Sequence, residues 1–250
     1  MSDITGFDNE NEFVKYLNGK TVGKLNPMFR ELIDVLYVNP KEDCVLKSWL
    51  NELPQKADFF VKINETTKGI SLKKGIKNSV HVEGISQFVH FLIENNISKD
   101  IVVNYLNYHY ADGTINGTGT KRISVEEYKN DHQYDIDRIN KVFNEEKILK
   151  EAINRFILKG NNSDYQIDAI IAGEIDDFLW ATRDDIEKII LSKKNSYSTG
   201  VHFGPITCQP KNRCLNYNSK YEKDRFSVQL KWYSLHDDII EMMNEKQKQL

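Results

Sequence analysis

One stretch constrains the fold more than any other: KADFFVKINETTKGISLKKG, at residues 56–75. Two runs rich in β-forming residues, 58–63 and 69–74, flank a turn-rich NETTKG segment, which predicts a β-hairpin. Because side chains alternate between the two faces of a strand, Ile70 and Leu72 point to one face, and Ser71 and Lys73 point to the other. The pattern therefore predicts a hairpin with an apolar face and a reactive polar face.

Helical periodicity surrounds this hairpin and predicts an α+β fold. Helices are predicted at residues 9–17, from Asn26 and Pro27 onward, at 44–53, and at later positions in the chain. The apolar run in YQIDAIIAG is compatible with a strand or a helix. Near the C-terminus, VHFGPITCQPKNR and RFSVQLKWYSL predict a second hairpin. The expected architecture is a core sheet flanked by helices, with a helical insertion and a C-terminal β-hairpin.

A length of 250 residues favours one elaborated domain, 1–250. We divide it into a core with N-terminal helices and the hairpin (1–110), a mainly helical part (111–200), and a C-terminal hairpin with a helix (201–250). No run of about eighteen apolar residues predicts a membrane span, and the N-terminus lacks a signal-peptide pattern. The expected location is the cytoplasm. Three cysteines without CxxC spacing argue against disulfides and a zinc site.

The charge is distributed unevenly along the chain, although the net charge is only −3. Six lysines and two acids fall in residues 56–81, and eight basic residues and two acids fall in residues 193–231. Residues 124–188 carry nine bases and sixteen acids. Two basic segments on an acidic body favour a polyanionic partner, because polyanions respond to local potential. Ordinary solvated lysines are the alternative explanation.

The first hairpin also carries the groups that phosphodiester chemistry needs. Pairing the strands about the middle of the turn places Asp58 opposite Lys74 and Phe59 opposite Lys73, so Asp58 and Lys73 are expected within reach of one another. A carboxylate is a preferred ligand of Mg²⁺, and an ammonium group near the attacked phosphorus stabilises developing charge. The hairpin therefore predicts a metal site that faces a phosphodiester. A chance occurrence of Asp and Lys in one hairpin is the alternative.

A second carboxylate, Glu10, shares a helix face with Phe13, Val14 and Leu17. A carboxylate on a buried face needs a partner or a metal ion. The alternative is a first-turn acid that is stabilised by the helix dipole and by water. Glu83 is interpreted as a first-turn acid of the next helix.

With these residues located, the chain resembles the PD-(D/E)XK nuclease superfamily, and within it the small type II restriction endonucleases. GFDNENEFVKYLN is similar to the opening helix with its Glu at Glu10, KADFFVKI to the strand that begins with the metal-binding Asp, and ISLKKG to the strand that ends in the catalytic Lys. The sequence departs from the pattern at Ala57, where the family has Pro, and at Ser71, where it has an acid.

The resemblance implies a restriction-endonuclease-like fold and Mg²⁺-dependent cleavage of double-stranded DNA at a short specific sequence. Asp58, Lys73, Ser71 and Glu10 would form the catalytic set, and Asp58, Glu10 and the carbonyl of Leu72 would bind the metal together with water. Glu83 is the alternative to Glu10 as the carboxylate that completes the metal site. A cognate DNA methyltransferase would be encoded nearby, and a homodimer on DNA is compatible with a palindromic site. A catalytically inactive, sequence-specific DNA-binding protein of the same fold is the alternative.

Side chains with the hydrogen-bonding groups that read base edges are concentrated in the C-terminal hairpin. These candidate DNA-binding residues are Gln209, Lys211, Asn212, Arg213, Arg225, Gln229 and Lys231. A second candidate set has the composition of a phosphate-contacting loop and comprises Lys74, Lys77, Asn78, Ser79 and His81. A solvent-facing sheet surface without a ligand is the alternative for the hairpin.

Overall fold

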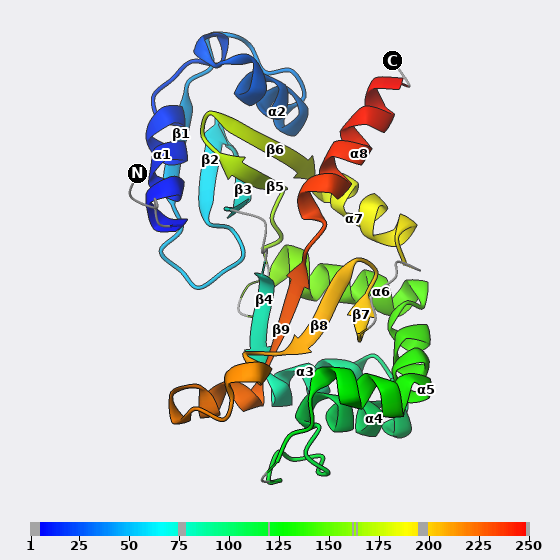
Figure 1. The fold of residues 1–250 in the computed structure, drawn as a ribbon. Coiled ribbons are helices and arrows are strands. Elements are labelled where there is room, and N and C mark those ends of the chain that lie inside the picture. The colour runs from blue at the N-terminus through cyan, green and yellow to red at the C-terminus, as the bar shows by residue number, and fades with distance from the viewer. Residues whose placement is uncertain are drawn as a thin grey trace. The chain divides into compact units, whose positions relative to one another are not determined.

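The structure is a computed structural model that describes residues 6–74, 79–119, 121–161, 163, 165–194 and 200–248 (Figure 1). Its elements, in chain order, are α1 (Gly6–Leu17), η1 (Val22–Lys24), α2 (Pro27–Tyr37), β1 (Leu46–Leu50), β2 (Phe59–Ile63), β3 (Thr66–Lys73), β4 (Ser79–Gly84), α3 (Ile85–Glu94), α4 (Lys99–Tyr110), α5 (Val125–Phe143), α6 (Glu146–Ala152), η2 (Ile153–Lys159), β5 (Ala169–Glu174), β6 (Asp177–Thr182), α7 (Arg183–Ser192), β7 (His202–Phe203), β8 (Ile206–Pro210), η3 (Arg213–Leu215), η4 (Ser219–Phe226), β9 (Ser227–Trp232) and α8 (Leu235–Lys248).

The chain divides into two compact units. Unit 1 comprises Met1–Asn78, Asn154–Ile189 and Ser234–Leu250, and unit 2 comprises Ser79–Ile153 and Ile190–Tyr233. The boundaries expected from the sequence, at 110 and at 200, do not coincide with the ends of these units, since the segment after residue 200 contributes to both. The single-domain organisation stays a prediction.

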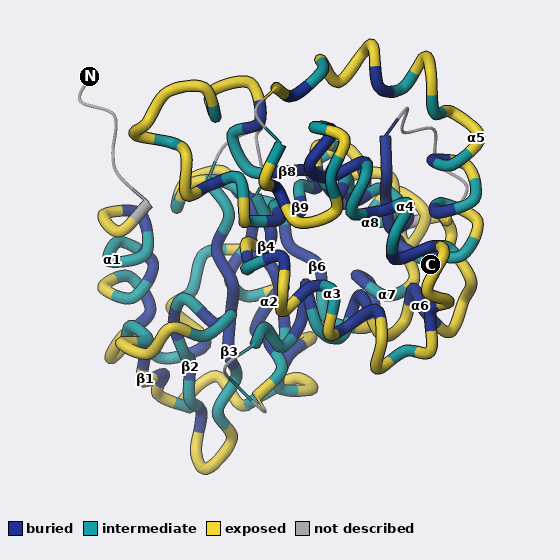
Figure 2. The backbone as a smooth tube through the Cα atoms, turned by 90° about the horizontal axis from the view of Figure 1, so that it is seen from below, coloured by how far each residue is buried: buried dark blue, intermediate teal, exposed yellow. Residues whose placement is uncertain are grey.

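Unit 1 is built on a mixed five-stranded sheet with the order β1-β2-β3-β5-β6. Neighbouring strands are antiparallel except for β3 and β5, which are parallel. One face of this sheet packs with α1 and α2 around a core that includes Phe13, Phe29, Phe59 and Ile70. Figure 2 shows α1 alternating between buried and exposed residues along its length, as expected for an amphipathic helix.

The register of the β2–β3 hairpin differs from the predicted one. Phe59 is the partner of Ile70, and Ile63 is the partner of Thr66, so the predicted pairing of Phe59 with Lys73 is wrong. The cause is a turn of only two residues, in which Asn64 adopts a positive φ of 53°. A shift by an odd number of residues exchanges the faces of a strand. In the observed register, Asp58 joins the face of Ser71 and Lys73, whereas the predicted register would have separated them.

The helix predicted at residues 44–53 is also wrong, because this segment contains the edge strand β1. Leu46 and Ser48 are buried, and Lys47 and Trp49 are exposed. This period of two is the signature of a strand with one buried face. The run is too short for periodicity in the sequence alone to separate the two possibilities.

Other expectations for unit 1 are confirmed. The side chain of Asn26 caps α2 by accepting a hydrogen bond from the Phe29 amide at 2.9 Å, and Pro27 occupies the first turn. The ambiguous apolar run of YQIDAIIAG ends in strand β5. Within the described part of the chain, no helix is both long enough and apolar enough to cross a membrane.

Unit 2 contains a four-stranded antiparallel sheet with the order β4-β9-β8-β7. The predicted C-terminal hairpin is confirmed as the β8–β9 pair, in which Gln209 is the partner of Gln229. An aromatic core underlies this unit: the rings of Phe143 and Phe203 stack at 4.4 Å, and the rings of Phe88 and Tyr105 lie 4.8 Å apart.

Candidate active site

Asp58 lies directly before β2 and is held by donors from β3. Its Oδ2 accepts hydrogen bonds from the Leu72 amide at 2.6 Å and from the Ser71 hydroxyl at 3.0 Å. The Asp58 backbone is fixed as well, because its amide donates to the Ile70 carbonyl at 2.8 Å and its carbonyl accepts from the Asn51 amide at 2.9 Å. The other carboxylate oxygen, Oδ1, accepts no hydrogen bond from the residues that the structure describes. It is therefore a free acceptor on an otherwise fixed side chain.

Lys73 ends β3 on the same face of the sheet. Its Nζ donates to the Ser71 hydroxyl at 2.7 Å and to the Leu72 carbonyl at 3.2 Å, and it lies 3.5 Å from Asp58 Oδ2. Ser71 itself is buried and links the two charged groups, since its hydroxyl accepts from Lys73 and donates to Asp58. This chain of hydrogen bonds places a cation and a carboxylate side by side at the end of two adjacent strands.

Glu10 lies within electrostatic range of both groups. Burial raises the pKa of its carboxyl, the negative charge of Asp58 raises it further, and the positive charge of Lys73 lowers it. The preceding residue, Asn9, is buried and donates to the Gly173 carbonyl at 3.0 Å, which ties α1 to the end of β5. α1 thus carries a second carboxylate toward Asp58.

The donor chemistry of this site suits a hard divalent cation. Asp58 Oδ1, the Leu72 carbonyl and the Glu10 carboxylate are oxygen donors, as Mg²⁺ prefers. Among the described residues, no cluster of three or more His, Cys, Asp or Glu side chains could hold a metal ion. One or two carboxylates with water and substrate phosphate are an ordinary ligand set for Mg²⁺, and a cation would also relieve the repulsion between Glu10 and Asp58. The residues present fit the ion.

Four of the predicted DNA-binding residues share one polar face of the unit 2 sheet. Along β8 and β9, alternate residues are buried, which leaves Gln209, Gln229 and Lys231 on the accessible face. Ser79 on β4 is the partner of Lys231, and its hydroxyl accepts a hydrogen bond from the Gln229 amide at 3.1 Å. The structure brings these four residues together, and we call them the polar sheet face. Ser79 had been placed in the other candidate set from the sequence.

The remaining residues of the C-terminal hairpin are engaged elsewhere within unit 2. Arg213 is buried and donates to the Ile123 carbonyl at 2.9 Å, and Arg225 donates to Asp112 and to the Gly119 carbonyl. Lys211 and Asn212 both bind Asp224, at 3.2 and 2.7 Å. Arg213 and Arg225 thus hold the loop after α4.

The second predicted set is only partly brought together. His81 is buried and lies 3.4 Å from the fully buried carboxylate of Glu83, on the core face of β4. The interpretation of Glu83 as a first-turn helix acid is therefore wrong, because the residue lies in a strand. Lys74 forms an ion pair with Glu174 at 3.2 Å. Lys77 and Asn78 lie outside the described residues.

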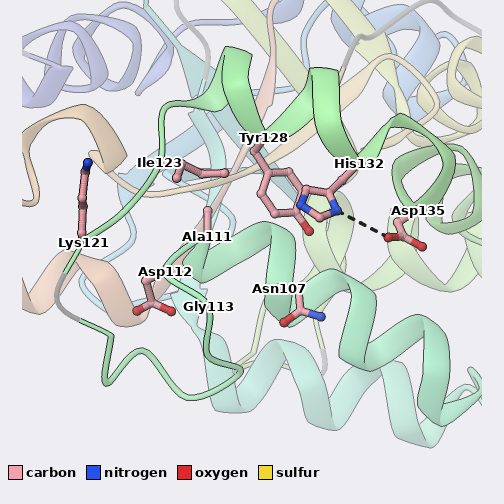
Figure 3. A pocket seen from close by; sticks show the side chains of 9 residues that line it. All are labelled: Asn107, Ala111, Asp112, Gly113, Lys121, Ile123, Tyr128, His132 and Asp135. Atoms are coloured by element: carbon pink, nitrogen blue, oxygen red, sulfur yellow. Dashed lines mark ion pairs between the residues drawn. The ribbon is translucent and has the colours of Figure 1, made fainter.

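A cavity of about 510 Å³ in unit 2 lies apart from the polar sheet face, between α4, the loop after it and α5 (Figure 3). The rings of Tyr128 and His132 stack in it at 4.3 Å, and His132 faces Asp135 at 3.8 Å. Burial, followed by the charge of Asp135, raises the pKa of Tyr128 to about 12, so its hydroxyl stays protonated at neutral pH. Sequence reasoning did not identify this cavity.

Sequence reasoning also missed the aromatic side chains beside Asp58. Trp49 on β1 and Phe60 on β2 stack at 5.6 Å, and Tyr165 meets Phe60 edge to face at 5.6 Å. The signal in the sequence was the alternation of LKSWL, but this run is too short to separate a strand from a helix.

Comparison with known proteins gives a structural match but no sequence match. No family model matches the chain, and no curated protein matches it either. The crystal structure of restriction endonuclease MspI in complex with its cognate DNA is similar, with a TM-score of 0.53 and 14% sequence identity, over 90% of this chain and 91% of that chain. At this identity the likeness extends to the fold alone. It confirms the predicted fold class: a restriction-endonuclease-like α+β fold with a mixed sheet flanked by helices.

Proposed function

We propose that this protein is a Mg²⁺-dependent endonuclease of the PD-(D/E)XK type that cleaves double-stranded DNA at a short specific sequence. The observation that carries the proposal is the convergence of Asp58, Ser71 and Lys73 on one face of the sheet, with 3.5 Å between Asp58 Oδ2 and Lys73 Nζ. The fold supports it independently, because a DNA-bound restriction endonuclease has the same architecture.

Each residue of the site has a distinct role in this proposal. Asp58 would hold the metal ion, and the hydrogen bonds that its Oδ2 accepts from Ser71 and Leu72 orient the side chain. The Leu72 carbonyl and Glu10 are the further ligands from the protein. Lys73 presents its ammonium group to the attacking water and to the charge that develops on the phosphate. Ser71 replaces the usual acid and positions Lys73 by accepting its hydrogen bond at 2.7 Å.

Bound Mg²⁺ supplies neutralisation of the phosphate and a coordinated water of lowered pKa. The chain itself supplies the fixed geometry around it. Asp58 and Lys73 are both more than two-thirds buried, at 25% and 19% side-chain exposure, so their charges are less screened than surface charges are. A partly buried cation and carboxylate act on a phosphodiester more strongly than the same groups in water.

The polar sheet face is the proposed reader of the DNA sequence. Gln209 and Gln229 are direct partners on adjacent strands, and glutamine can donate to and accept from the edge of adenine in the major groove. Lys231 adds a cation that suits guanine or phosphate. A nearby gene for a cognate methyltransferase and dimerisation on a palindromic site belong to the same proposal.

One observation favours the alternative of a DNA-binding protein without activity. Ser71 stands where a metal-binding acid is usual, so the protein offers one ligand fewer for the ion. Such a protein would keep salt-sensitive DNA binding and lack cleavage.

Incubation of the protein with plasmid DNA and Mg²⁺ tests the proposal. Discrete fragments are expected, and Lys73→Ala is expected to lower the cleavage rate by two orders of magnitude or more, as is usual on loss of a group that stabilises the transition state. Lys24→Ala is the matched control, because Lys24 is an exposed lysine outside the site.

The two functions give different results in this experiment. DNA binding without fragments, in wild type and Lys73→Ala alike, would support the inactive binding protein. Equal cleavage by wild type and Lys73→Ala would overturn the assignment of the site. Sequencing the ends of the fragments would then give the recognition sequence and the position of the cut.

A further inference from the structure

The aromatic row beside the candidate active site is a preformed surface. Trp49 on β1, Phe60 on β2 and Tyr165, whose ring lies over Gly69 of β3, follow one another on the face of the unit 1 sheet that also carries Asp58 and Lys73. Trp49 is 41% exposed and Tyr165 is 36% exposed. Large aromatic side chains exposed in a contiguous group mark a binding surface more often than scattered single residues do.

The row is held rigidly by its neighbours. Gly69 is the partner of Phe60 on β3, and its lack of a side chain lets the Tyr165 ring lie over the strand: a Cβ at Gly69 would come within 2.5 Å of that ring. The Tyr165 hydroxyl accepts from the Gly69 amide at 2.8 Å and donates to Asp168 at 2.6 Å. Aromatic surfaces fixed in this way lose little conformational freedom when a ligand stacks on them.

Two lysines lie beside the row at the next position along the strands. Lys47 on β1 and Lys62 on β2 are direct partners on the same face as Trp49 and Phe60. Like charges directly opposite one another destabilise a strand pair, so this position favours an anion. The 3.1 Å contact of Lys62 with Glu65 offsets the repulsion only weakly, because Glu65 is 97% exposed.

Next to the candidate metal site at Asp58, β2 carries an aromatic surface at Phe60 and a cation at Lys62. Asp58, Phe60 and Lys62 are two residues apart, which corresponds to about 6.7 Å between successive positions. An aromatic surface beside cationic groups is the combination that binds single-stranded nucleic acid, because bases stack on the rings and phosphates pair with the cations.

We propose that this face binds an unpaired nucleotide of the DNA strand that occupies the active site. Its base stacks on Trp49 and Phe60, with Tyr165 at the edge, and a neighbouring phosphate lies between Lys47 and Lys62. The inference rests on the proposed function for the placement of DNA at Asp58 and Lys73, and it adds that the bound substrate is locally single-stranded.

The chemistry of the face separates this ligand from a duplex. In a duplex, the flat faces of the bases are covered by their neighbours in the stack, so an exposed aromatic row gains contact only with unpaired bases. A second copy of this chain on the same surface is an outcome that the fluorescence experiment below distinguishes.

Tryptophan fluorescence gives a direct readout, because Trp49 differs from the other two tryptophans in exposure. Trp180 and Trp232 are 6% and 0% exposed. The protein is titrated, in EDTA and at low salt, with a short oligothymidylate, an abasic strand of the same length, and a blunt duplex. Quenching is expected with oligothymidylate, little quenching with the abasic strand or the duplex, and none in Trp49→Leu.

Binding of the labelled oligothymidylate, followed by anisotropy, measures the contribution of each group. Trp49→Ala is expected to weaken it by about five- to 150-fold, the usual range for loss of one stacked base. Tyr134→Ala, which removes an exposed aromatic side chain in α5, is the matched control and should change little. Lys47→Gln should reduce the salt dependence of binding, and Lys24→Gln should not.

Equal quenching by the abasic strand, or no effect of Trp49→Ala on affinity, would overturn the inference. So would Trp49 fluorescence that changes with protein concentration in the absence of DNA, because it would place a second copy of the chain on this face. The experiment contains no Mg²⁺ and no cleavage. A protein that binds oligothymidylate through Trp49 but does not cleave DNA would refute the proposed function alone. A protein that cleaves DNA but whose Trp49 fluorescence does not respond to oligothymidylate would refute the inference alone.

Discussion

The Lys73 side chain is held in one position by the oxygen atoms around it. Three oxygen atoms lie within 3.5 Å of its Nζ, from the side chains of Ser71 and Asp58 and from the Leu72 carbonyl. An ammonium ion has three protons to donate, so these three acceptors fix its position. A lysine held in this way acts as a positioned cation rather than as a mobile surface charge.

A first prediction concerns Glu10, whose charged form is disfavoured by burial and by Asp58. In EDTA, Glu10→Gln is expected to be more stable than wild type at pH 7, because it removes a charge that burial and Asp58 disfavour more than Lys73 favours it. Since the raised pKa in the folded state makes stability fall as pH rises through it, this gain should vanish below pH 4.5. Mg²⁺ should raise the melting temperature of wild type more than that of Glu10→Gln.

Thermal unfolding with and without Mg²⁺ measures both effects, and Glu12→Gln on the same helix is the control. A wild-type melting temperature that does not respond to Mg²⁺ would argue against a metal site formed by the protein alone. A Glu10→Gln variant that is less stable than wild type in EDTA would show that the carboxylate has a favourable partner.

A second prediction concerns His109, which is fully buried with its Nε2 2.9 Å from the Arg225 carbonyl. Burial, opposed in part by this hydrogen bond and reinforced by the charges of Arg122 and Arg213, lowers its pKa to about 3. In the unfolded chain the ring takes a proton near pH 6.5, whereas in the folded chain it stays neutral. Stability is therefore lost as pH falls below 6.5, by about 2 kcal/mol at pH 5.

Urea unfolding at pH 7.5 and at pH 5 measures this loss, and comparison with His109→Gln isolates it. The variant should be less stable than wild type at pH 7.5, but its stability should fall by about 2 kcal/mol less between the two pH values. An identical pH dependence in both proteins would mean that the ring is protonated in the folded state.

At the scale of elements, the β2–β3 hairpin decides the geometry of the site. Its two-residue turn sets the register, and the register sets which side chains share a face. β5 then pairs in parallel with β3, from Ile70 opposite Ala169 to Lys73 opposite Ala172. This pairing fixes β3 on both sides, so that Lys73 ends a central strand.

The prediction at this scale is that Gly69→Ala destabilises the protein by about 1–3 kcal/mol, the usual cost of overpacking. The added Cβ would lie 2.5 Å from the Tyr165 ring and 3.1 Å from both Ala57 and Phe60. Gly84→Ala is the control, since the nearest neighbour of its added Cβ is the Gln87 side-chain oxygen at 3.6 Å, an ordinary contact, and it should change stability by less than about 1 kcal/mol. Chemical denaturation compares the two variants, and equal stabilities would show that Tyr165 moves away without cost.

At the scale of the whole molecule, the uneven charge distribution matters more than the net charge of −3. Several basic residues of the two basic segments form ion pairs within the protein. Lys68 pairs with Asp168, and Lys211 pairs with Asp224. Lys231, on the polar sheet face, lies 5.5 Å from the ring of Tyr233. The positive potential available to DNA is thus smaller than the sequence count suggests.

The corresponding prediction concerns the salt dependence of DNA binding. If Lys231 contacts a phosphate, Lys231→Ala should lower the slope of log K against log salt concentration by about 0.9. Gln229→Ala should leave the slope unchanged and reduce the preference for the recognition sequence, by about 1–3 kcal/mol. Anisotropy titrations at several salt concentrations test both. An unchanged slope in Lys231→Ala would place this lysine on a base edge or away from the DNA.

Much of the local structure was determined by the sequence by itself. Three predicted features depend on near neighbours in the chain. They are the helix cap at Asn26, the period of two in β9, and the separation of Ile70 and Leu72 from Ser71 and Lys73 on the two faces of β3. Local hydrogen bonds and alternating burial act over a few residues, so they can be recognised without knowledge of the fold.

Only the tertiary structure decided which of these elements meet. Four features of the structure depend on residues far apart in the chain. They are the register that brings Asp58 to Lys73, the strand character of β1, the hydrogen bonds of Arg213 and Arg225 to a distant loop, and the placement of Tyr165 over Gly69. Tyr165 and Gly69, for example, are separated by 96 positions. Such contacts are selected by packing and by the burial of polar groups across the whole unit, and no local pattern encodes that competition.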